Sequence, residues 1–93
     1  MKKFVKKIEE FEVKISPTEC VYELNVVSKM VGIAPWKIRA LVKEGIVRPK
    51  IIGKKKKLFS LKDIKKLEYI KYLMDEEGVN IKGIKIILEM KKI

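Results

Sequence analysis

The sequence predicts a mainly α-helical fold with two short helices joined by a tight turn, a small β-hairpin and a C-terminal helix pair. Three observations predict it. First, residues that favour helix starts and stops delimit two short segments within residues 22–49. Second, β-branched and aromatic runs flank a Gly-led turn within residues 46–59. Third, apolar residues recur at helical spacing over residues 61–91. This order is typical of a winged helix-turn-helix domain. We assign that domain to residues 21–93, after an N-terminal arm over residues 1–20.

The two short helices are defined by the residues at their ends. Asn25 is a favoured N-cap residue type, which predicts a first helix over residues 26–30 that stops at Gly32. Pro35 suits the first position of a second helix, because its missing N–H would be unpaired there anyway. Gly45 can adopt the left-handed conformation that ends this second helix near residue 44.

The second helix separates apolar from basic side chains. At 100° per residue, one side carries Ile38, Leu41 and Val42, which we expect to pack against Val26, Val27, Met30 and Ile33. The other side carries Trp36, Arg39, Ala40 and Lys43. Together with Lys37, these are the residues that we expect in a DNA major groove. They offer cationic groups, a small residue and a flat apolar ring. Trp is more often a core residue, but the helical spacing predicts that Trp36 is exposed.

The chain is strongly basic, and the charge is unevenly placed. Its formal net charge is +11; residues 1–21 hold five Lys and four Glu, a net of +1, so residues 22–93 carry +10. A basic compact domain indicates a polyanionic partner, most commonly a nucleic acid. A membrane surface is the competing polyanion, but it requires a basic amphipathic helix with a broad apolar face, and here the basic residues cluster in the turn-rich middle.

The β-hairpin carries a lysine run that indicates a DNA-contacting wing. Residues 46–52 and 58–59 flank Gly53 and four lysines: Lys54, Lys55, Lys56 and Lys57. A lysine run is usually a solvated loop, but beside a helix-turn-helix it favours a wing along flanking phosphates or in the minor groove. We expect Arg48 and Lys50 to contact DNA at the base of the wing, and Tyr22 and Ser28 to add hydrogen bonds to the backbone.

Two longer helices follow the hairpin. Ser60 and Asp63 form a capping-box-like start for a helix that stops at Gly78, and Asn80 can cap a last helix over residues 81–91. Their inward stripes are Leu61, Ile64, Leu67, Tyr69, Ile70 and Leu73 in one helix, and Ile81, Ile84, Ile87 and Leu88 in the other. A second face of the last helix carries Ile86, Met90 and Ile93, and we expect it to serve self-association unless Phe4, Ile8 and Phe11 cover it.

The N-terminal arm has mixed patterns. We expect a helix over residues 2–10, an extended segment over residues 11–15 and a chain break at residues 16–18, where Pro17 lies between Ser16 and Thr18. The arm either caps the core or pairs with a second subunit.

Composition argues against several classes of protein. The chain has no His and one Cys, Cys20, so an internal disulfide and a structural zinc site are excluded. It lacks nucleophile and phosphate-loop motifs, so we expect no catalytic residue, no metal and no cofactor. No apolar run of 18 residues and no signal peptide are present, which together with the lone thiol predicts a cytoplasmic protein.

The chain resembles the DNA-binding domain of MerR-type transcription regulators over residues 21–91. The resemblance is carried by Val21, Tyr22, Val26 and Val27, by residues 35–45 with Ile38 and Arg39, by Ile46, Val47 and Pro49, and by residues 58–60 leading into Asp63 and Ile64. Residues 75–85 are similar to the heat-shock repressor branch of that family.

The resemblance implies a dimer that binds an inverted repeat and often bends it. Arg39 matches the Arg of the second helix with which the family contacts the DNA backbone, and Lys57 matches the family's wing Arg. Leu41 stands where the family usually has a Tyr, Trp36 where a small polar residue is common, and Lys54 and Lys55 where a Gly pair is common.

We therefore expect a sequence-specific, double-stranded DNA-binding transcription regulator, a repressor that reads an inverted repeat as a homodimer formed through the N-terminal arm or the C-terminal helix. Two alternatives stay open. One is an architectural or excisionase-like accessory factor that bends DNA, and the other is a protein-interaction adaptor with a basic face.

Overall fold

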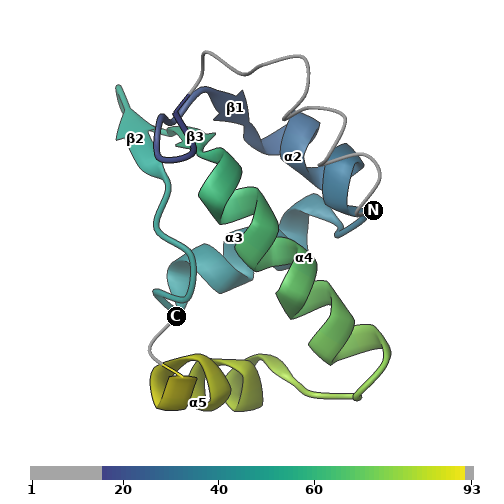
Figure 1. Ribbon diagram of the computed structural model, residues 1–93. Coiled ribbons are helices and arrows are strands. Elements are labelled where there is room, and N and C mark those ends of the chain that lie inside the picture. Colours follow the sequence, from purple (N-terminus) through teal and green to yellow (C-terminus); the bar gives the residue numbers. More distant parts are fainter. Residues whose placement is uncertain (1–15, 92–93) are drawn as a thin grey trace.

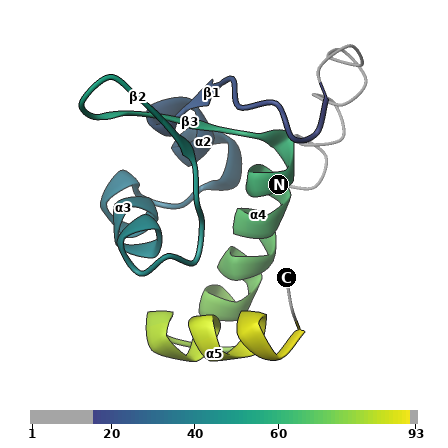
Figure 2. The same cartoon turned by 90° about the vertical axis from the view of Figure 1, so that its left-hand side faces the viewer.

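The computed structural model describes residues 16–91. Their elements, in chain order, are β1 (Tyr22–Glu23), α2 (Leu24–Val31), α3 (Pro35–Lys43), β2 (Lys50–Ile52), β3 (Lys56–Phe59), α4 (Leu61–Asp75) and α5 (Ile81–Lys91). Figures 1 and 2 show α4 running from the small sheet at one end of the molecule to α5 at the other. The mainly α-helical winged helix-turn-helix fold is confirmed, whereas the expected helix over residues 2–10 and the extended segment over residues 11–15 lie outside the described residues.

The first helix starts earlier than the sequence predicts. Asn25 is not its N-cap: α2 begins at Leu24, after Glu23, whose side chain makes no capping hydrogen bond. Strand pairing explains the shift, because Tyr22 and Glu23 pair with Phe59 and Leu58 of β3, and the chain turns into the helix directly after this strand. The predicted stop at Gly32 is confirmed, since this residue has a φ of 74° and its N–H donates to the carbonyl of Ser28.

The sheet has one strand more than the predicted hairpin. Its order is β1-β3-β2, and both pairings are antiparallel. Strand β1 has only two residues, too few for an alternating pattern to show in the sequence. The hairpin itself is confirmed, but it is shorter at its start than expected, because Ile46 and Val47 are buried in the core before β2 begins.

The predicted starts of both long helices are confirmed. In α4 the N–H of Asp63 donates to the Ser60 hydroxyl (3.0 Å), and the N–H of Ser60 donates to the Asp63 carboxylate (2.9 Å). Helix α4 ends at Asp75, three residues before Gly78. In α5 the N–H of Gly83 donates to the side-chain oxygen of Asn80 at 2.8 Å. The capping motifs were therefore readable from the sequence.

The core lies between α2, α3, the sheet and α4, with α5 added at the far end. Its largest fully buried side chains are Phe59, Ile38, Leu41, Ile64, Leu67, Ile70, Ile84, Val27, Val31 and Val47. The expectation that Val26 joins the core is wrong, because it is 48% exposed. The buried stripe of α2 is Val27, Met30 and Val31, and Val26 lies 100° from Val27 on the helix.

Within residues 16–91, no helix combines the length and the apolar character that crossing a bilayer requires. In the same part of the chain, His, Cys, Asp and Glu form no group of three or more that could hold a metal ion.

Candidate nucleic-acid interface

Helix α3 has one buried face and one exposed face. Ile38 and Leu41 are fully buried, whereas Trp36 is 63% exposed and Arg39 and Lys43 are also exposed. Pro35 occupies the first turn as predicted, where its missing N–H leaves no donor unpaired. The predicted exposure of Trp36 is confirmed, so α3 presents an aromatic ring and two cations on the side away from the core.

The remaining residues of the exposed face support this arrangement. The ammonium of Lys37 lies 5.6 Å from the centroid of the Trp36 ring, within range of a cation–π interaction. Ala40 is half-buried and has the smallest side chain of the face, which allows close approach of the helix to a ligand surface. The face can therefore offer a flat ring, a close-approach point and three cationic groups to the edges of base pairs.

The turn before α3 is held by Ser28. Its hydroxyl donates a 2.6 Å hydrogen bond to the carbonyl of Ile33, which ties α2 to the turn that leads into α3. The expected DNA contact of Ser28 thus has to coexist with this internal bond, in which the hydroxyl oxygen keeps its capacity to accept. Tyr22 is 9% exposed and belongs to the core, so only the edge of its side chain is accessible. Both DNA contacts stay predictions.

The wing and α3 lie on one side of the molecule. Figure 2 shows α3 and the turn between β2 and β3 projecting to the left of α4. Gly53, with a φ of 65°, starts the turn. Lys54 and Lys55 are exposed there, while Lys56 and Lys57 belong to strand β3 and not to the tip. Helix α3 and the β2–β3 hairpin can therefore approach one extended polyanion together.

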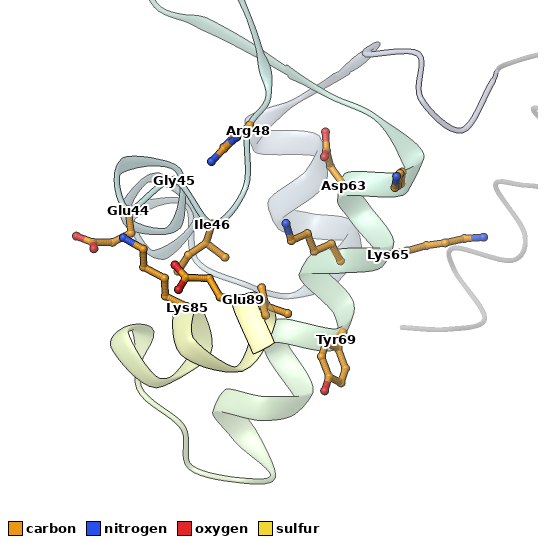
Figure 3. Close-up of a pocket in the computed structure, with 12 residues that line it drawn as sticks. Glu44, Gly45, Ile46, Arg48, Asp63, Lys65, Tyr69, Lys85 and Glu89 are labelled. Atoms are coloured by element: carbon orange, nitrogen blue, oxygen red, sulfur yellow. The ribbon is translucent and has the colours of Figure 1, made fainter. Parts of the chain in front are cut away.

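The two cations at the base of the wing have different settings. Lys50 is exposed at the start of β2, beside the wing. Arg48 is exposed in the segment between α3 and β2, where it lines a cleft with α4 (Figure 3). The structure brings Trp36, Lys37, Arg39, Ala40 and Lys43 together on α3, and Lys50 with the four lysines on the hairpin. Arg48 precedes the hairpin and lines the cleft.

The sequence did not single out three surface residues of the sheet. Ile51 and Ile52 are 51% and 43% exposed on β2, and Glu23 forms an ion pair with Lys56 at 2.9 Å. The two isoleucines belong to the predicted hairpin, and a strand of three residues is too short for an alternating pattern to show which side chains face solvent. The ion pair depends on β1 pairing with β3, which no local pattern reveals.

Comparison with known proteins gives two matches. The family described as MerR HTH family regulatory protein matches residues 22–91. A heat shock protein named HspR from Streptomyces coelicolor is 31% identical over 71 residues, which are 76% of this chain and 47% of that protein. The chain therefore spans about half the length of this curated relative.

Proposed function

The chain belongs to the MerR family of helix-turn-helix regulatory proteins, and from this premise we propose that it is a repressor that reads an inverted repeat in double-stranded DNA. Proteins of this family are DNA-binding transcription regulators. The repressor assignment is supported by residues 75–85, which are similar to the heat-shock repressor branch of the family. DNA binding in the cytoplasm is part of the same proposal.

One observation carries the proposal: the face of α3 opposite Ile38 and Leu41 is exposed and basic, and the lysine hairpin lies on the same side of the molecule. We assign Trp36, Lys37, Arg39, Ala40 and Lys43 to the major groove. We assign the hairpin lysines to flanking phosphates or the minor groove, because ammonium groups position a protein on the backbone without reading sequence. Lys50, Arg48, Ser28 and Tyr22 complete the proposed contacts.

Reading an inverted repeat requires two copies related by a twofold axis. Helix α5 supplies one apolar face for this, since Ile86 and Met90 are 57% and 78% exposed. The N-terminal arm is the other candidate. We place the dimer contact on α5, because an exposed pair at i and i+4 lies on one side of a helix and can pack against its symmetry mate.

The test is selection of bound duplexes from a random pool, followed by salt titration on the recovered site. We expect a twofold-symmetric sequence. If six to eight phosphates are neutralised, log affinity falls with log salt at a slope of about −5 to −7. Arg39→Ala costs about 1–3 kcal/mol of binding if its guanidinium reads a base. A flat salt response contradicts the proposal, and tandem occupancy without symmetry indicates an architectural factor.

A further inference from the structure

A cleft of about 900 Å³ lies between residues 44–48, which follow α3, and helices α4 and α5 (Figure 3). Its two ends differ in charge. One end is lined by Arg48 and by Lys62 and Lys66 of α4, which are close enough to influence one another electrostatically. Asp63 is the acidic residue at this end. At the other end Glu44, Lys85 and Glu89 lie near one another in Figure 3, so opposite charges are mixed.

The cationic end has little internal neutralisation. One carboxylate oxygen of Asp63 already accepts the N–H of Ser60 at 2.9 Å in the α4 capping box. Among residues 16–91, Arg48, Lys62 and Lys66 form no ion pair with a carboxylate. Three positive charges therefore share this end of the cleft with one carboxylate, Asp63, and one of its oxygens is engaged at the helix start.

The setting of Lys66 shows the electrostatic consequence. Burial lowers the pKa of its ammonium from the ordinary value of 10.5; Asp63 opposes this shift, and the positive charges of Arg48 and Lys62 add to it. An anion placed among these groups turns the repulsion into attraction and replaces the water that burial has removed. A bound anion would therefore offset both the repulsion among these three cations and the desolvation of Lys66.

We propose that this end of the cleft binds a phosphate group through Arg48, Lys62 and Lys66. The guanidinium can donate two parallel hydrogen bonds to phosphate oxygens, and the two ammonium groups add charge without a fixed direction. The volume of the cleft falls in the range of small-molecule sites, and Ile46 and Leu88 add apolar lining for the body of a phosphate ester. The site goes beyond the proposed function, because Lys62 and Lys66 belong neither to α3 nor to the wing.

The phosphate has two possible sources, a free phosphate ester or the DNA backbone, and the experiment separates them. The first arm is a ¹H–¹⁵N NMR titration of the full chain without DNA, with inorganic phosphate and with adenosine 5′-phosphate. Adenosine, and sodium chloride at the same ionic strength, are the controls. For a free ligand we expect saturable shifts confined to Arg48 and residues 62–66, together with a rise in the pKa of Lys66.

Variants make this arm specific. Lys66→Gln weakens phosphate binding about tenfold or more, as expected for the loss of a charge-assisted hydrogen bond. Lys66→Arg retains binding because it keeps the charge. Lys29→Gln removes an exposed lysine of α2 outside the cleft and leaves binding unchanged. Lys66→Gln is expected to fold, since it removes a half-buried charge that two other cations repel. The melting temperatures of the variants check this.

The second arm uses the selected duplex. If the phosphate belongs to the DNA backbone, free phosphate gives no saturable shifts. Lys66→Gln then lowers the magnitude of the slope of log affinity against log salt by about one, and Lys29→Gln lowers it less. The proposal is overturned if neither arm distinguishes Lys66→Gln from Lys29→Gln. In that case, if Arg39→Ala still weakens DNA binding, the proposed function is retained and only the phosphate site is ruled out.

Discussion

The ammonium of Lys56 lies 2.9 Å from a carboxylate oxygen of Glu23. This ion pair joins strand β3 of the wing to β1, the strand that leads into α2. The two side chains are 58% and 56% exposed, so solvent screens the attraction and the pair adds little to stability. Its larger effect is on charge, because Glu23 partly neutralises one of the four lysines proposed to contact phosphates.

Replacing Glu23 tests that effect. We expect Glu23→Gln to change the free energy of unfolding by less than about 1 kcal/mol. Duplex affinity should rise, because the variant removes a negative charge beside the wing and frees Lys56, and the salt slope should steepen by up to about one. Urea denaturation and fluorescence anisotropy at several salt concentrations measure both quantities. A loss of affinity would show that Glu23 positions the wing instead.

Substitutions of Trp36 and Ile38, which lie on opposite faces of α3, should affect DNA binding and stability separately. Trp36→Ala removes a side chain that is 63% exposed. We therefore expect the free energy of unfolding to change by no more than about 0.5 kcal/mol, while duplex affinity falls. Ile38→Ala empties a fully buried position and should cost about 2–5 kcal/mol of stability. Denaturant titrations give the stabilities. A strongly destabilised Trp36→Ala would indicate that the ring packs in the folded core.

The reciprocal capping of α4 makes Ser60 a stability determinant. Ser60→Ala removes the acceptor of the Asp63 N–H, and we expect a loss of about 1 kcal/mol. For a domain of this size, that corresponds to a fall in Tm of about 4–8 °C. Thermal unfolding followed by circular dichroism measures it. Thr18→Ala, at an exposed position near the start of α4, serves as the control; equal melting temperatures for the two variants would rule out the cap as the cause.

Lys66 should make stability depend on pH in the alkaline range. Its folded-state pKa lies below the value of 10.5 expected in the unfolded chain, mainly because of burial. Between the two pKa values the unfolded state binds more protons, so the free energy of unfolding rises as pH increases through this window. Lys66→Gln should remove that rise. Urea titrations from about pH 8 to about pH 10.5 compare the two proteins, and parallel curves would contradict the assignment.

Self-association should depend on the apolar face of α5. Ile86→Glu with Met90→Glu places two charges on that face and should lower the association constant measured by sedimentation equilibrium. Val26→Glu, at an exposed apolar position of α2, is the matched control and should have no such effect. If the association constant of the α5 variant is unchanged, the dimer contact would be assigned to the N-terminal arm instead.

Much of the fold was readable because it is encoded locally. Pro35, Gly45 and the Ser60–Asp63 pair each act within one helical turn, so their residue types predicted the helix ends. The alternation of faces on α3 likewise predicted the exposure of Trp36. Local rules failed at Asn25, because a strand paired to a segment more than thirty residues later set the helix start.

The cleft and the ion pair could not be read from the sequence for a related reason. Helical spacing puts Lys62 and Lys66 outside the apolar stripe of α4, which predicts solvated side chains, and Arg48 is predicted at the base of the wing. Only the tertiary approach of residues 44–48 to α4 brings the three cations together. Charge that is spread along a chain predicts a polyanionic partner, but its gathering into a site depends on the packed fold.

Helix α3 and the wing are proposed to contact one DNA surface together. The most direct measurement is a ¹H–¹⁵N NMR titration with the selected duplex, in which the indole N–H of Trp36, the one Trp of the chain, gives a single resolved signal. We predict that this signal, the amides of α3 and those of residues 53–57 shift along the same saturation curve. Shifts confined to other elements, with the Trp36 indole unmoved at saturation, would contradict the account.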